Sequence, residues 1–181
     1  MTCSGMGDEA PAAVAERLAL EKARAIAHGR SDGIPVVGAD TVVVHQGRVL
    51  NKPKDTQEAR DMLCSLRGDE HVVVTGIALV SGGVERTGHA STRVTMREYS
   101  DEEIEEYIQS GDCMDKAGAY GIQHPAFSPA AGVDGCYMNV VGLPLCALAR
   151  MLRDAGVGVT TKRPEWSLPA QCLECGMRDG M

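Results

Sequence analysis

Two pairs of β-rich runs, each joined by a tight turn, restrict the fold of this chain more than any other feature. Residues 34–44 and 48–50 flank Gln46-Gly47, while residues 71–80 and 84–97 flank a second turn, Ser-Gly-Gly. Branched residues favour strands, and a short turn with glycine joins two strands as an antiparallel hairpin. We therefore expect two hairpins as the framework of the fold, the second one long.

Helices are predicted around these hairpins. Apolar residues at helical spacing predict helices over residues 10–28, 55–66 and 144–155, and the acidic run after Ser100 predicts another. Asp55 with Glu58, and Ser100 with Glu103, have the spacing of a capping box. Residues 139–145 read as a buried strand leading into the last helix, with packing as the preferred role. The order predicts a mixed α/β domain with antiparallel pairs, not a repeated βαβ ladder.

Composition excludes several classes of protein. The 181 residues suffice for one domain with a real core, the net charge is −7, and aromatic residues make up 3%. A chain without a basic block is a poor duplex DNA binder, and one with few aromatics is a poor single-strand binder. A nucleic-acid polymer is therefore not an expected partner, whereas a small anionic substrate is compatible with local cations or a metal.

The cellular location is inferred from cysteines and hydropathy. The seven cysteines are an odd number and are mostly scattered singly, which suits a reducing compartment better than a disulfide framework. No apolar run reaches the roughly 18 residues of a membrane span, and the first residues lack the pattern of a signal peptide. We expect a cytoplasmic protein with no membrane partner.

The first hairpin carries polar residues in otherwise apolar strands. Asp40 follows Gly38-Ala39, where small residues allow close approach of a ligand, and its carboxylate could serve as a metal ligand or general base. A simple turn cap is the alternative. Lys52 follows the hairpin and could pair with phosphate, although an ordinary exposed lysine fits the pattern as well.

A second group of candidate residues lies in the segment MDKAGAYGIQ. Asp115 and Lys116 precede a small-residue stretch that ends at Gln123, whose amide could read the edge of a base. The alternative is a turn-rich connector. In the tail, Cys172-x-x-Cys175 is a single pair with no histidine after it, so reduced thiols are preferred over a zinc site within one chain.

Together these motifs resemble one family, the Maf-like nucleoside triphosphate pyrophosphatases. The resemblance covers residues 4–153 and rests on separate signatures in the family's order and spacing: RLALEKARAIA, VVGADTVVV, NKP, AxxMLxxLxG, HVVVTGIAL, MDKAGAYGIQ and NVVGLPL. It implies an α/β chain of the Maf/Ham1 (ITPase-like) fold, with a long twisted mixed sheet, flanking helices and a cleft between two lobes.

The resemblance also implies an activity. Family members hydrolyse a nucleoside triphosphate to the monophosphate and pyrophosphate with a divalent cation, Mg²⁺ or, as the alternative, Mn²⁺. The form AYGIQ is that of the branch acting on dTTP and UTP. A homodimer is compatible with the resemblance.

Roles for individual residues follow from the same resemblance. The family's proton acceptor falls on Asp40, which with Glu9 is also an expected metal ligand. Lys22 and Lys52 match lysines that face the cleft and would stabilise charge on phosphate oxygens. The residues expected to bind substrate or to set specificity are Thr41, Asp115, Lys116 and Gln123.

The chain departs from the family at its start. The family's first strand and its Ser-x-Ser-Pro-Arg-Arg loop, which binds phosphate, have no counterpart before residue 4. We expect residues 1–158 to form a Maf-like domain truncated at the N-terminus and residues 159–181 an irregular extension. Loss of these elements predicts an aggregation-prone chain of weak activity, and the alternative function is a catalytically impaired, nucleotide-binding relic.

Overall fold

The computed structural model describes residues 9–30 and 32–158. The expected extension at 159–181, with its Cys-x-x-Cys pair, lies outside them. The elements are, in order, α1 (Pro11–Ala27), β1 (Val36–His45), β2 (Arg48–Leu50), α2 (Thr56–Leu66), β3 (Glu70–Ser81), β4 (Val84–Met96), α3 (Asp101–Gln109), the 3-10 turns η1 (Asp112–Asp115) and η2 (Ala117–Ala119), β5 (Ala130–Asp134), α4 (Tyr137–Val141) and α5 (Leu145–Asp154). This confirms the α/β class with helices around a sheet.

Both predicted hairpins are present in a five-stranded sheet of order β2-β1-β3-β4-β5. Every pairing of the described strands is antiparallel, so within the described residues the sheet is not the mixed one that the family resemblance implied. Gln46-Gly47 and Gly82-Gly83 turn the chain with φ values of 48°, 75°, 55° and 80°, the left-handed region that two-residue hairpin turns require. Since β2 pairs only with the last three residues of β1, no described strand covers the outer edge of residues 36–42.

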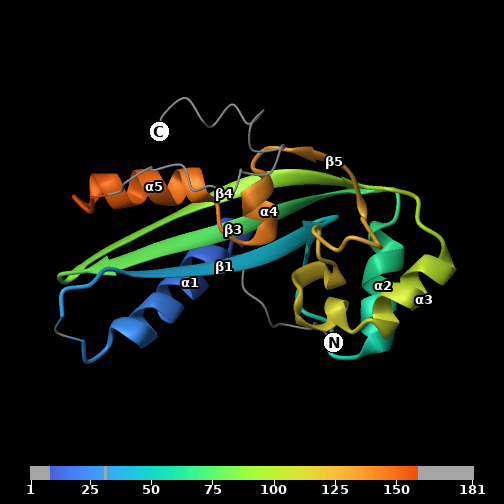
Figure 1. The fold of residues 1–181 in the computed structure, drawn as a ribbon, viewed down its shortest axis with the longest axis horizontal. Helices are drawn as coiled ribbons and strands as arrows, with labels where there is room; N and C mark the ends of the chain where they lie inside the picture. Colours follow the sequence, from blue (N-terminus) through green and yellow to red (C-terminus); the bar gives the residue numbers. More distant parts are fainter. Residues whose placement is uncertain (1–8, 31, 159–181) are drawn as a thin grey trace, which may run out of the picture.

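Helix α1 packs on one face of the sheet, and α4 and α5 lie on the other (Figure 1). The buried face of α1 is a row of alanines, Ala15, Ala19 and Ala23. It meets glycines of the sheet, because a Cβ added to Gly38 would lie 2.1 Å from the Ala19 carbonyl oxygen, and one on Gly76 would lie 2.2 Å from the Ala15 carbonyl carbon. Small residues on both sides therefore bring the helix backbone close to β1 and β3.

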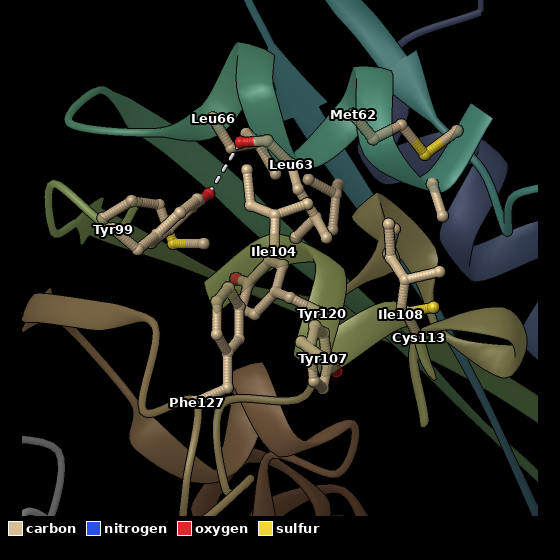
Figure 2. Close-up of a cluster of buried hydrophobic side chains, with 14 of the residues drawn as sticks. Met62, Leu63, Leu66, Tyr99, Ile104, Tyr107, Ile108, Cys113, Tyr120 and Phe127 are labelled. Atoms are coloured by element: carbon tan, nitrogen blue, oxygen red, sulfur yellow. Dashed lines mark hydrogen bonds between the residues drawn. The ribbon is translucent and has the colours of Figure 1, made fainter. Parts of the chain in front are cut away.

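Helices α2 and α3 gather at one end of the sheet over the largest apolar cluster (Figures 1 and 2). Leu63, Leu66 and Ile104 are fully buried there, and the hydroxyl of buried Tyr99 donates a hydrogen bond of 2.7 Å to the Leu63 carbonyl. The capping box of α3 is present as predicted. At α2 the Asp55 cap is present, but Glu58 accepts from the Lys54 backbone N–H rather than from that of Asp55.

The strand expected over residues 139–145 is wrong. Residues 137–141 form the short helix α4, and Gly142 ends it at a φ of 116°. The reason is the buried side chain of Asn139, which bonds to backbone groups of β3, so this segment anchors to the sheet by side chain and not as a further strand.

No helix in the described ranges is long and apolar enough to cross a membrane.

Candidate active site

All eight residues that the sequence singled out line one cavity, which has a volume of about 1310 Å³. The cavity lies at the open edge of β1, between residues 11–22 of α1, the residues after β2 and the segment from η1 to Pro125. The predicted residues on its wall are Glu9, Lys22, Asp40, Thr41, Lys52, Asp115, Lys116 and Gln123. Residues far apart in sequence thus meet beside the outer edge of β1, the edge that does not pair with β3.

Asp40 and Lys22 form an ion pair on the α1 side of the sheet. The Lys22 ammonium donates to Asp40 Oδ1 at 2.5 Å and to the Ala39 carbonyl at 3.2 Å. The Asp40 side chain is 17% exposed and that of Lys22 is 58% exposed, so both reach the cavity. Among the described residues none donates to the second oxygen of Asp40, which is left to accept a proton or to bind a cation.

Thr41 points to the opposite face of the sheet from Asp40, because neighbouring residues of a strand alternate. Its hydroxyl lies 2.9 Å from that of Thr75, its cross-strand partner on β3. Thr75 is fully buried and is hydrogen-bonded to Asn139 of α4. The cavity therefore reaches both faces of β1, with a charged pair on one face and a hydroxyl on the other.

The segment before Gln123 is braced by its own polar residues. The Lys116 ammonium donates to the Asp112 carbonyl, to Asp112 Oδ1 and to Asp115 Oδ1 at 2.7–2.9 Å, which uses all three of its protons. Tyr107 donates to Asp112 Oδ2 at 2.7 Å and accepts from the Gly121 backbone N–H. Burial opposes ionisation of Asp112, but the bonds from Tyr107 and Lys116 outweigh it and lower the Asp112 pKa. Substrate binding by Lys116 and Asp115 stays a prediction.

Other cavity groups are open to a ligand. Lys52 and Gln123 are exposed and make no hydrogen bond or ion pair with the part of the chain that the structure describes. Sequence reasoning missed Arg48, another exposed cation on the wall, although it comes directly after the Gln46-Gly47 turn. It also missed Arg17, which lines the cavity and binds the Glu9 carboxylate at 3.2 Å. Arg17 is thus paired with Glu9 and Glu21, whereas Lys52 and Arg48 are cations on this wall that the described residues leave unpaired.

The rest of the cavity is apolar. Its wall there is formed by side chains from β1, β3, α4 and the η2 region, namely Val43, Val73, Tyr120, Ile122, Val140 and Val141. Tyr120 also belongs to the cluster under α2 and α3 (Figure 2), so the core holds this wall in place. A cavity with cations in one part and apolar side chains in another suits a ligand with an anionic part and a flat, less polar part.

The cavity wall offers an open carboxylate oxygen of Asp40 to a metal that arrives with an anionic ligand. Within the described ranges no three His, Cys, Asp or Glu residues cluster as a dedicated metal cage. Mg²⁺ in triphosphate sites is commonly bound by one or two carboxylates together with phosphate oxygens. Asp40 has one oxygen open and meets that requirement, whereas both oxygens of Glu9 accept from Arg17, so Glu9 as a metal ligand stays a prediction.

The fold and the site together define an α/β domain whose cavity holds an acid–lysine pair, further cations and an apolar wall. This arrangement suits a protein that binds a phosphorylated small molecule. The family model described as "Maf-like protein" matches residues 3–155, and the chain belongs to this family.

Curated relatives agree with the family assignment. The chain is 48% identical over 149 residues to a protein of Koribacter versatilis named dTTP/UTP pyrophosphatase, covering 82% of this chain and 77% of the relative. Proteins of the same name from Moorella thermoacetica and Symbiobacterium thermophilum are 49% and 48% identical over 151 and 153 residues. These matches cover 82% and 84% of this chain, and 77% and 78% of the relatives.

Proposed function

We propose that this protein hydrolyses nucleoside triphosphates, dTTP and UTP in particular, to the monophosphate and pyrophosphate. The observation that carries the proposal is the meeting of Asp40 and Lys22 with Lys52, Thr41 and Gln123 in one cavity. The names of the relatives, at 48–49% identity, supply the reaction and the nucleotides.

Each group has a distinct part in this reaction. Asp40 accepts a proton from the attacking water through its open oxygen, while Lys22 holds its other oxygen and fixes the carboxylate. Lys52 and Arg48 stabilise negative charge on the phosphate oxygens. The apolar wall with Tyr120 receives the base, and Gln123 contacts its polar edge.

A divalent cation, Mg²⁺ or Mn²⁺, is part of the proposal. Glu9 would hold it together with the phosphates, and Asp40 would be a further ligand if its open oxygen binds the cation instead of accepting the proton. When bound, such a cation offsets triphosphate charge and favours attack at phosphorus. We also propose a cytoplasmic location and, as a separate point that sedimentation would test, a homodimer.

The direct test is pyrophosphate release from a panel of the common nucleoside triphosphates, with Mg²⁺ and with excess chelator. We expect turnover of dTTP and UTP above that of the other nucleotides, and loss of turnover with chelator. Nucleotide binding without release of pyrophosphate from any member of the panel would contradict the proposed activity and favour a non-catalytic role.

A further inference from the structure

The direction of the hydrogen bond between Thr41 and Thr75 is fixed by the other partner of the Thr75 hydroxyl, which is Asn139. The Thr75 hydroxyl has one proton and lies 2.8 Å from the backbone carbonyl oxygen of Asn139, which can only accept. Thr75 therefore donates to Asn139 and has only lone pairs to offer Thr41. Thr41, 2.9 Å away, must be the donor of the bond between the two hydroxyls.

Asn139 is held so firmly that this direction is built into the fold. It is fully buried, and its Oδ1 accepts from the Thr75 backbone N–H at 3.2 Å. Its Nδ2 donates to the Val73 carbonyl at 3.0 Å and to Thr92 Oγ1 at 2.9 Å. These bonds hold Asn139 in place, and with it the backbone carbonyl that accepts from the Thr75 hydroxyl.

The consequence for the cavity is a hydroxyl of fixed polarity. The proton of Thr41 is directed to Thr75, so Thr41 offers the cavity only lone pairs and must meet an N–H or O–H of the ligand. The cavity wall around Thr41 includes Val43, Val73 and Val140, which supply no competing polar side chain.

We propose that Thr75, held by Asn139, is a positioning residue that makes Thr41 an acceptor for the N3–H of uracil or thymine. The inference rests on the proposed function, because it takes the base to be one of these two. Each of them has a single N–H once the sugar is attached at N1, and that is N3–H. Cytosine has a lone pair at N3, which would face the lone pairs of Thr41, so the arrangement selects UTP against CTP.

The experiment compares kcat/KM for UTP and CTP in wild type, Thr75→Val and Thr75→Ser. The wild type should prefer UTP by about tenfold or more, the scale set by a mismatched hydrogen bond in a pocket. In Thr75→Val the Thr41 hydroxyl is free to turn and donate to cytosine N3, so the ratio should fall toward one. Thr75→Ser restores the hydroxyl and should restore the ratio.

Controls separate this effect from simple loss of stability. The ratio is independent of the fraction of folded enzyme, because both nucleotides are measured on one sample. Thr92→Val removes a buried hydroxyl from the far end of the same network, so it should lower the urea midpoint and leave the ratio unchanged. Thr41→Val removes the acceptor itself, so it should abolish the preference even where Thr75→Val fails to fold.

The outcomes are distinct for the two proposals. Active wild type with a ratio near one, or Thr75→Val with the wild-type ratio, overturns the role of Thr75 while the proposed function stands. A wild-type protein without turnover overturns the proposed function. In that case the role of Thr75 is tested by the ratio of the Kd values for UMP and CMP instead of by kcat/KM. A tenfold preference for UMP that Thr75→Val removes supports the positioning role, and equal Kd values or no binding overturns it.

Discussion

Asp40 combines exposure to the cavity with a fixed orientation, as a proton acceptor requires. Replacing it by Asn keeps its size but removes the negative charge that accepts a proton. We expect Asp40→Asn to lower the turnover of UTP by about a hundredfold or more, the usual contribution of a general base. The melting temperature should change little, since Lys22 is 58% exposed and can be solvated without its partner.

Asp61→Asn is the matched control, because Asp61 is exposed on α2 and does not line the cavity. It should keep wild-type turnover. Near-normal turnover in a folded Asp40→Asn protein would remove Asp40 from the role of proton acceptor.

Gln123 differs from Asp40 in what it can control. Its exposed amide both donates and accepts, and it has no partner among the described residues, so it is available to a base edge. We expect Gln123→Glu to change the ranking of dTTP, UTP and CTP more than the rate with the best nucleotide. The check is kcat/KM for each of the three, and a uniform loss would show that Gln123 does not read the base.

Among the elements, α1 is the one whose position decides whether the site exists. It carries Lys22 and lies against Gly38 and Gly76, where backbone atoms of the helix would meet any added Cβ at 2.1–2.2 Å. Gly76→Ala should therefore push α1 away from β3 and lower the free energy of unfolding by about 1–3 kcal/mol, the usual cost of overpacking. Turnover should fall as well, because displacement of α1 disturbs the pair between Lys22 and Asp40.

Gly132→Ala, in β5, is the control for this change. There an added Cβ meets nothing closer than 3.9 Å, so the free energy of unfolding should stay within about 0.5 kcal/mol of wild type. Urea denaturation measures the free energy of unfolding of Gly76→Ala and of Gly132→Ala. Equal stability of the two variants would mean that the contact of α1 with Gly76 adjusts without cost.

The stability of the whole molecule should depend on pH through a buried histidine. His71 is 2% exposed, and burial, with the nearby charge of His45, lowers its pKa to about 4 from 6.5. Between these values the unfolded chain binds a proton that the folded protein excludes, so stability is full above pH 6.5 and falls toward pH 4. The loss at pH 4 should be roughly 3 kcal/mol.

Variants assign this loss to His71. His71→Gln can keep a hydrogen bond to the Tyr120 hydroxyl, which lies 2.7 Å from the His71 ring nitrogen. This variant should reduce the change of the urea midpoint between pH 7 and pH 4.5. The exposed His28→Gln should keep the wild-type slope. A second decline is expected below pH 3.8, because the hydrogen bond with His45 lowers the Asp69 pKa to about 2. Wild type and His71→Gln with the same slope from pH 7 to pH 4.5 would contradict the assignment.

The local features of the sequence predicted most of the elements. Hairpin turns, capping residues and apolar spacing depend on neighbours a few residues away, which is why both hairpins and the helices α1, α2, α3 and α5 lie where they were expected. The motifs also identified eight residues that all line the cavity, although their roles stay predictions. Arg48 was missed because a single arginine after a turn has no distinguishing pattern.

Tertiary structure alone decided how these residues are used. Asn139 sits in a short apolar run that suits a strand or a helix equally, and its partners on β3 are 64 and 66 residues away. Those contacts hold α4 on the sheet, where the backbone carbonyl of Asn139 accepts from Thr75 and so directs the proton of Thr41 to Thr75. The close approach of α1 to Gly76 likewise depends on two elements that share no local pattern. Sequence by itself determined the elements and the candidate residues, whereas contacts between distant strands and helices determined the site, because hydrogen-bond direction and backbone approach exist only in the packed molecule.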